Sequence, residues 1–156
     1  MSKKRQSAKD RLMMLGYELA KPSAPAASYL PISKSSNLIF VSGQLSANEK
    51  GIIGGVLGKD MNIEQGQVAA RHCALSILSQ IAFSANVELD DIKKIVKITV
   101  LVCSTPLFQD HHLVANGASD LLATVLGENG KHARAAFGVI ALPLGAAVEI
   151  EAIIEV

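Results

Sequence analysis

The hydrophobic residues of the chain follow two different periods in its first half. Short apolar runs at 29–33 and 37–42 are separated by the polar triplet 34–36, a pattern that predicts a β-hairpin. Asn62 followed by Gln65 is typical of a helix capping box. Apolar residues then recur at helical spacing, so we predict a long helix over about 63–85.

The second half repeats the change from strand to helix. The β-branched run 95–103 is too densely apolar for a one-sided edge strand, which predicts an interior strand. A second helix begins at Thr105 or Asp110, presents its apolar positions to the sheet, and ends at the turn 127–130. Two alternating segments, 132–139 and 147–156, are joined by a short Pro/Gly turn and predict a final pair of strands.

The last two predicted strands carry Arg134 and Glu149, charges that a purely structural strand does not need. If these strands pair antiparallel, a rigid guanidinium and a carboxylate lie on neighbouring strands. Such a pair suits recognition of a small acid beside a group that moves a proton. The sequence does not say whether the two side chains share a face of the sheet.

The order of elements is strand, strand, a short glycine-broken strand, helix, strand, helix, strand, strand, which predicts an α+β sandwich with helices on one sheet face. We expect residues 24–156 to form a single domain. Residues 1–23 are a polar, basic extension that we expect to be partly helical, with Asp10 as a helix cap, before a connector containing two prolines.

The last strand predicts an oligomer. Val148, Ile150, Ala152 and Ile154 alternate with Ala147, Glu149, Glu151 and Ile153, so both faces of this strand carry apolar side chains. One face packs under the helices, and the apolar residues on the other favour burial against a second copy of the chain.

Composition excludes several classes of protein. The 156 residues are 49% hydrophobic with a formal net charge of +1, the make-up of one globular domain rather than of a nucleic-acid binder. The aromatic content of 4% leaves few platforms for base stacking.

No apolar run approaches a membrane span or a signal-peptide core, so we expect a soluble, cytoplasmic protein without nucleic-acid or membrane partners. Cys73 and Cys103 lack metal or disulfide spacing and are expected to be reduced core residues.

The remaining polar residues form no familiar catalytic pattern. The four histidines (His72, His111, His112 and His132) lack metal-ligand spacing, and we expect structural or solvated roles and no metal site. There is no P-loop and no nucleophile elbow. Glu149 and Glu151 lie about 7 Å apart on one strand face, a spacing compatible with glycoside hydrolysis, but the low aromatic content makes a poor sugar platform.

Taken in order, several segments together resemble the RidA/YjgF family of imine deaminases, also labelled the endoribonuclease L-PSP family. They are Ser28-Tyr29, Phe40-Val-Ser-Gly-Gln44, Val96-Lys-Ile-Thr-Val, Asn116, His132-Ala-Arg134, Ala141-Leu-Pro143 and Val148-Glu-Ile-Glu-Ala152. The resemblance covers about residues 24–156. It implies a chorismate-mutase-like α+β sandwich, a mixed β-sheet with two helices on one face, that assembles as a homotrimer with active sites in clefts between subunits.

The resemblance also implies an activity. Family members hydrolyse reactive 2-imino and enamine acids to 2-oxo acids and ammonia without a cofactor. By position, Arg134 is similar to the family's carboxylate-binding arginine and Glu149 to its water-orienting acid. Tyr29, Ser42, Gly43 and Asn116 are similar to residues lining the same cleft, and we expect the backbone amide at Ala136 to help hold a carboxylate. Ala136 stands where typical members carry a cysteine, which indicates a divergent branch whose substrate differs.

Two other functions stay open at this point. The first is a non-catalytic trimeric module that binds small 2-oxo or carboxylic acids in the same cleft. The second is ribonuclease activity, which rests only on a name attached to the family. The nearly neutral charge and the scarcity of aromatic residues disfavour it.

Overall fold

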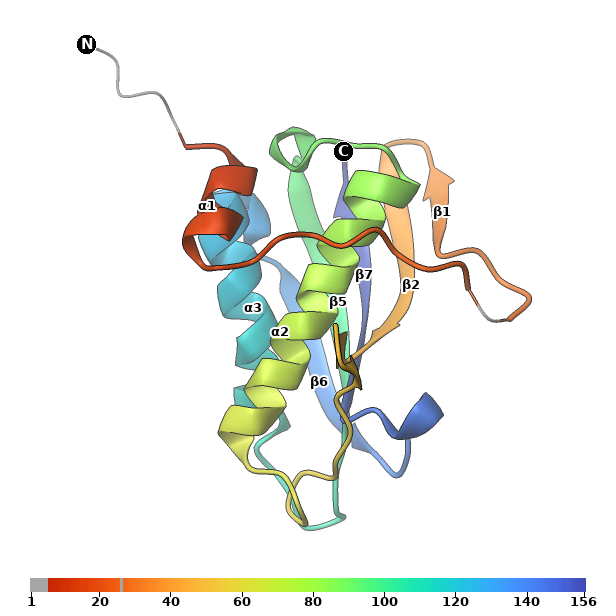
Figure 1. Cartoon of the computed structure of the whole chain (residues 1–156), viewed down its shortest axis with the longest axis vertical. Helices are drawn as coiled ribbons and strands as arrows, with labels where there is room; N and C mark the ends of the chain where they lie inside the picture. The colour runs from red at the N-terminus through yellow and green to blue at the C-terminus, as the bar shows by residue number, and fades with distance from the viewer. Residues whose placement is uncertain (1–5, 26) are drawn as a thin grey trace.

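Two helices pack against one face of a five-stranded β-sheet in the computed structural model, which describes residues 6–25 and 27–156 (Figure 1). The helices are α2 (Ile63–Ser79) and α3 (His111–Leu126). The strands of the sheet are β1 (Ile32–Ser35), β2 (Leu38–Leu45), β5 (Lys94–Cys103), β6 (Ala133–Val139) and β7 (Val148–Glu155). A small separate hairpin is formed by β3 (Ala47–Asn48) and β4 (Gly51–Ile52). The predicted α+β class is confirmed.

The sheet is mixed, with the strand order β1-β2-β7-β5-β6. β1 and β2 form the predicted hairpin, and β5 lies between two neighbours as predicted. The predicted pairing of the last two strands is wrong, because β6 runs parallel to β5 and β7 pairs with the opposite side of β5. The reason is the α3 crossover, which returns the chain to the same end of the sheet and makes β6 parallel to β5. The segment 140–147 then carries the chain past the end of β5.

The helix α2 begins as its sequence predicts. The Asn62 side chain accepts a hydrogen bond from the Gln65 N–H at 2.8 Å, and the Gln65 side chain accepts one from the Asn62 N–H at 2.9 Å. The helix continues into a π-helical turn at Gln80–Ser84, so the helical segment ends close to the predicted residue 85. The buried Gln80 amide donates to the Gln44 side chain on β2 at 3.3 Å, which joins this turn to the sheet.

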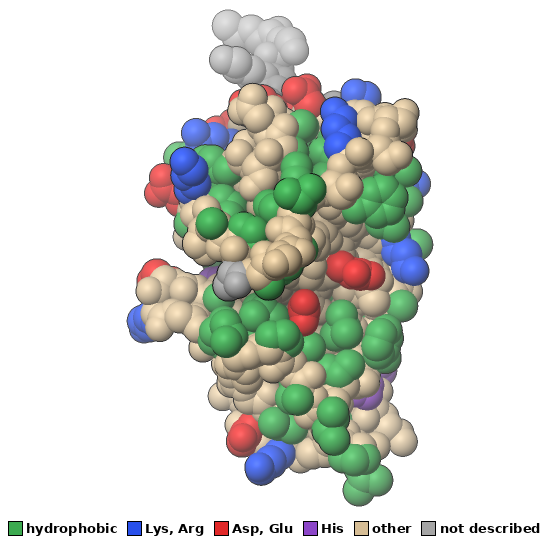
Figure 2. Space-filling model, turned by 90° about the vertical axis from the view of Figure 1, so that its right-hand side faces the viewer, with side chains coloured by type: hydrophobic (Ala, Val, Ile, Leu, Met, Phe, Trp, Pro, Cys, Tyr) green, Lys and Arg blue, Asp and Glu red, His purple; other side chains and the backbone are tan. Residues whose placement is uncertain are grey.

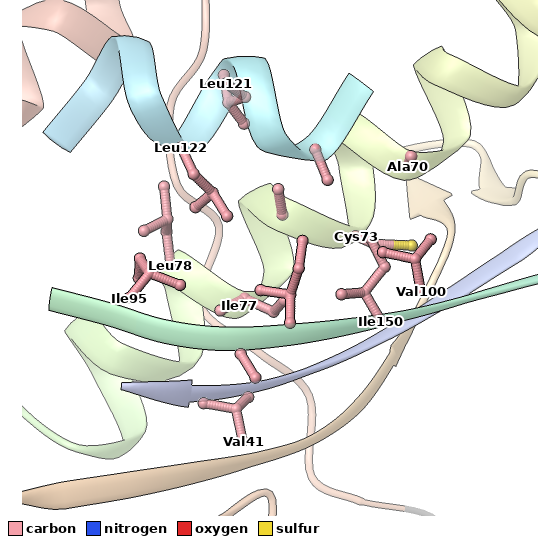
Figure 3. Close-up of a cluster of buried hydrophobic side chains, with 14 of the residues drawn as sticks. Val41, Ala70, Cys73, Ile77, Leu78, Ile95, Val100, Leu121, Leu122 and Ile150 are labelled. Atoms are coloured by element: carbon pink, nitrogen blue, oxygen red, sulfur yellow. The ribbon is translucent and has the colours of Figure 1, made fainter. Parts of the chain in front are cut away.

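The hydrophobic core lies between the two helices and the sheet. Figure 3 shows Leu121 and Leu122 of α3 and Ile77 and Leu78 of α2 pointing toward strand residues that include Ile95, Val100 and Ile150. The inward residues of β7 are those predicted from its alternation, and Val148, Ile150 and Ile154 are fully buried. Cys73 and Cys103 are free thiols, and both are buried, as predicted. Burial raises the pKa of both thiols, which keeps them protonated near neutral pH.

A third helix, α1 (Ala8–Met14), packs beside α3 rather than on the sheet (Figure 1). Ser7 is its N-cap, and Asp10, which we predicted as the cap, is the third helical residue and completes the capping box. Leu12 is buried in the common core, and the Arg11 Nε donates to the Val125 carbonyl at 2.6 Å. The segment after α1 then crosses α2 on its way to β1 (Figure 1).

The sheet face opposite the helices is only partly apolar. Its exposed aromatic side chains are Phe40 on β2 and Phe137 on β6, at 42% and 46% of their full exposure. Glu149 and Glu151 belong to the same face, because they alternate with the buried residues of β7. On the side of the molecule shown in Figure 2, Lys and Arg side chains are scattered among acidic and hydrophobic ones and form no basic stripe. No described helix is both long and apolar enough to cross a membrane.

Candidate functional site

Arg134 projects from β6 onto α3, where three neutral acceptors hold its guanidinium. Its Nη1 donates to the Asn116 Oδ1 at 2.9 Å and to the Ser119 Oγ at 3.1 Å, and its Nη2 donates to the His112 carbonyl at 3.1 Å. These acceptors lie at intervals of three and four residues along α3 and therefore share one face of the helix. We call Arg134, Asn116, Ser119 and the His112 carbonyl the arginine half-site.

The charge of Arg134 is not neutralised within the described part of the chain. No carboxylate of a described residue forms an ion pair with the guanidinium, whereas the nearby Lys131 Nζ and Glu128 Oε1 lie 2.6 Å apart. Its three hydrogen bonds use three of the five N–H donors of an arginine and leave the Nε–H and one Nη2–H available. Guanidinium donors of this kind match the geometry of a ligand carboxylate. Ala136, two residues along β6, lies on the same side of the strand and is half-buried.

Glu149 lies at an irregularity between β2 and β7. The pairing shifts between Val41 and Gln44, so Ser42 and Gly43 stand opposite the single residue Glu151. The Glu149 carboxylate then lies over the Gly43 Cα, and a Cβ at this glycine would stand 2.0 Å from its Oε1. Glycine at position 43 therefore makes room for the acid.

The bulge also fixes the segment that contains Tyr29. The Ser42 Oγ donates to the Leu30 carbonyl at 2.6 Å, and the Ser42 N–H donates to the Pro31 carbonyl at 3.0 Å. These bonds hold Tyr29, which is 52% exposed, next to the bulge. We call Glu149, Gly43, Ser42 and Tyr29 the carboxylate half-site.

The Glu149 carboxylate receives no hydrogen bond from any described residue. Burial raises its pKa above the ordinary value for glutamate, and the neighbouring Glu151 carboxylate raises it further. A carboxyl group with a raised pKa is suited to accept and return a proton. These surroundings differ from those of a structural ion-pair partner.

The two half-sites lie on opposite faces of the sheet in one chain. Arg134 is level with Ile98 on β5, and Ile98 is buried under the helices. Glu149 is level with Leu101 and belongs to the face without helices. Because β5 also separates their strands, Arg134 and Glu149 of one chain do not meet. The structure groups Arg134 with Asn116, and Glu149 with Ser42 and Gly43.

A cavity lies elsewhere, between α2 and the segment 16–25 that crosses it. Its volume is about 670 Å³, and it touches only Tyr29 and Gly43 among the predicted site residues. Its charged lining residues have both signs (Glu18, Lys21 and Glu49), so they favour no single ligand charge. Arg134, in contrast, presents an uncompensated cation, and we therefore centre the candidate site on the two half-sites.

The four histidines do not gather into one site. His111 bonds to Ser104 at 2.9 Å, His132 bonds to Ser119 at 2.9 Å, and His72 packs edge-on against Tyr17. Among the described residues, no group of three His, Cys, Asp or Glu side chains is arranged to hold a metal ion.

Sequence reasoning missed three members of the arginine half-site and its surroundings. They are Ser119, the His112 carbonyl and His132, which bonds to Ser119. The signal was present, because Ser119 lies three residues after Asn116 on a predicted helix, and His132 lies two residues before Arg134 on a predicted strand. Both spacings place side chains on a common face.

The fold places the protein in the class of RidA-like α+β sandwiches. The family model described as Endoribonuclease L-PSP matches residues 20–156, and the chain belongs to this family. This result confirms the resemblance found in the sequence. The match begins after α1, so the first helix lies outside the family model.

Three known proteins illustrate the similarity. "Protein TCP17" from Trypanosoma cruzi is 46% identical over 146 residues, which cover 92% of this chain and 91% of that protein. The crystal structure of Atu1372 from Agrobacterium tumefaciens is similar with a TM-score of 0.88 and 45% identity, covering 96% of this chain and 92% of that one. RidA from an Antarctic Psychrobacter is similar with a TM-score of 0.59 and 25% identity, covering 97% of both chains.

Proposed function

We propose that this protein hydrolyses small 2-imino and enamine acids to 2-oxo acids and ammonia, in clefts between copies of the chain. One observation carries the proposal: Arg134 is held in place by three neutral acceptors and has no anionic partner among the described residues. A fixed, half-buried cation of this kind is matched by a small carboxylate ligand. Membership of a family that contains RidA supports the same substrate class.

The proposed reaction begins when the ligand carboxylate binds to Arg134. The oxygen of a water molecule then adds to the carbon of the protonated C=N bond, whose π electrons move to nitrogen, while Glu149 accepts a proton from the water. Glu149 returns this proton to the nitrogen of the carbinolamine. The hydroxyl proton then passes to solvent water as the C–N bond breaks, and the products are the 2-oxo acid and ammonia. The raised pKa of Glu149 suits it to both transfers.

Because the two half-sites lie on opposite faces of one chain, the proposal requires Arg134 from one copy and Glu149 from another. The exposed aromatic residues Phe40 and Phe137 on the helix-free face support burial of that face between copies. We propose a homotrimer, the assembly implied by the family resemblance, with one cleft at each of its three interfaces.

The family name also raises the possibility of ribonuclease activity. A net charge of +1 and an aromatic content of 4% give little support for binding a polyanion or stacking its bases. A small carboxylic acid can pair its carboxylate with the Arg134 guanidinium, and we therefore favour deamination.

The test uses 2-aminoacrylate, generated in situ from serine by a dehydratase, with semicarbazide to trap the imine that survives. We expect wild-type protein to lower the trapped imine. Arg134→Ala and Glu149→Ala should each lose activity by about a hundredfold or more. Arg71→Ala on α2 is the matched control, because it removes an arginine outside both half-sites.

Unchanged trapping with wild-type protein would falsify the deaminase proposal for this substrate. Binding of 2-oxobutyrate that disappears in Arg134→Ala, in the absence of any turnover, would instead identify a non-catalytic binding module. RNA cleavage that persists in Arg134→Ala and co-purifies unevenly with the protein would indicate a contaminant.

A further inference from the structure

Two Ser–His pairs with the same separation lie beside α3, and only one of them touches Arg134. The Ser119 Oγ is 2.9 Å from the His132 Nε2, and the Ser104 Oγ is 2.9 Å from the His111 Nε2. Ser119 also accepts a hydrogen bond from the Arg134 Nη1 at 3.1 Å, whereas Ser104 has no contact with that guanidinium. The first pair is therefore connected to the candidate site and the second is a natural comparison.

The hydrogen-bond network assigns the tautomer of His132. Its Nδ1 lies 2.6 Å from the Gly130 carbonyl, which can only accept a hydrogen bond, so Nδ1 carries the proton. In the neutral ring the Nε2 is then an acceptor, and the Ser119 hydroxyl donates a hydrogen bond to it. Burial lowers the pKa of His132 and outweighs the hydrogen bond to the Gly130 carbonyl, which raises it. The charge of Arg134 also lowers this pKa, and the net lowering favours the neutral ring near pH 7.

This arrangement fixes the direction of the Ser119 hydroxyl group. With its proton committed to His132, Ser119 presents an oxygen lone pair to the Arg134 Nη1. Gly130 anchors the other end, because it packs against α3 so closely that a Cβ there would stand 2.1 Å from the Leu122 carbonyl oxygen. The chain of bonds thus runs from the Gly130 backbone through His132 and Ser119 to the guanidinium.

We propose that His132 and Ser119 are positioning residues that hold the Arg134 guanidinium in the orientation that receives a ligand carboxylate. The inference rests on the proposed function for the identity of the ligand, and on the hydrogen bonds above for the geometry. Asn116 Oδ1 and the His112 carbonyl accept two other hydrogen bonds from the Arg134 guanidinium. Of the three acceptors, only Ser119 has a hydroxyl group, and the direction of that hydroxyl depends on His132.

The experiment compares full-length wild type with Ser119→Ala and His132→Gln, using protein labelled with ¹⁵N in arginine and histidine. In the wild type we expect the His132 ring to show a protonated Nδ1 and an unprotonated Nε2, and the Arg134 Nη groups to rotate slowly. Either substitution should speed that rotation and weaken 2-oxobutyrate binding about tenfold, equivalent to about 1.4 kcal/mol.

Ser104→Ala and His111→Gln are the matched controls, since they remove the second Ser–His pair beside the same helix. They should change neither the Arg134 signals nor the affinity. The inference is overturned if the wild-type Nδ1 is unprotonated, if the Arg134 groups rotate freely, or if both pairs of variants behave alike. The His132 protonation and the Arg134 rotation are measured first on the wild type, so they test the positioning role even where a variant does not fold.

The design separates this inference from the proposed function. If wild-type protein binds no 2-oxobutyrate but shows the expected His132 and Arg134 signals that change in Ser119→Ala, the positioning role stands and the deaminase proposal loses its support. If 2-oxobutyrate binds equally well to wild type, Ser119→Ala and His132→Gln, the positioning role is wrong and the carboxylate site stands.

Discussion

The two half-sites are built in opposite ways. Arg134 is held by three neutral acceptors from one helix face and has no anionic partner among the described residues. Glu149 has no described hydrogen-bond donor and lies against the bare backbone of Gly43. The first arrangement immobilises a permanent charge, whereas the second leaves a proton free to move. Under the proposed function, carboxylate binding and proton transfer thus have different structural requirements, and the residues proposed for them lie on opposite faces of one sheet.

The largest effect that tests this contrast is expected from Arg134→Lys. Lysine keeps the positive charge but replaces the planar fork of donors with a single ammonium group on a flexible stem. If immobilisation is what matters, 2-oxobutyrate affinity and imine turnover should both fall about a hundredfold, close to the values for Arg134→Ala. Retention of most of the wild-type affinity, measured by calorimetry, would show that charge alone is sufficient.

The separation of the half-sites can be tested by mixing chains. Arg134→Ala and Glu149→Gln proteins, each inactive alone, are unfolded together and refolded. If each cleft takes its arginine from one chain and its acid from another, random assembly restores about a quarter of wild-type turnover. A mixture as inactive as its components would mean that each cleft uses both residues from a single chain.

A smaller effect is expected from Gly43→Ala. The new Cβ would occupy the position of the Glu149 Oε1 and push that flexible side chain aside. We expect turnover to fall about tenfold while 2-oxobutyrate affinity and the melting temperature stay close to wild type. A parallel loss of affinity would contradict the division between a binding half and a proton-transfer half.

The smallest effect concerns stability and its dependence on pH. Because the pKa of Glu149 is raised in the folded state, its ionisation opposes folding, and this penalty develops as pH rises from the ordinary glutamate pKa through the raised one. Glu149→Gln should therefore raise the melting temperature by about 1–3 °C at pH 7.5. The difference should vanish below about pH 4, where both forms are neutral. Glu88→Gln, at an exposed position outside both half-sites, is the control.

Much of the fold was predictable because local signals and burial agreed. The capping box at Asn62, the dense apolar run of β5 and the alternation of β7 each report a feature of one segment, and the structure contains all three. The position of β6 was not predictable in the same way. Strand pairing depends on the path of the crossover helix, and no single segment encodes it.

The candidate site likewise depends on contacts between segments that no single segment of the sequence encodes. Residue types at Arg134 and Glu149 pointed to binding and proton transfer, but only the three-dimensional structure places them on opposite faces. Ser119 and His132 were on predictable faces of their own elements, yet their contact requires knowing that α3 lies over β6. The hydroxyl direction of Ser119 further depends on the tautomer of His132, which is a property of the network rather than of either residue.

The buried thiols of Cys73 and Cys103 make the chain unreactive toward gentle alkylating reagents at neutral pH. A cysteine introduced in place of Ala136 would then be the one addressable thiol in the described chain, two residues from Arg134. A fluorophore or spin label attached there would report on ligand entry directly, without first removing any native cysteine.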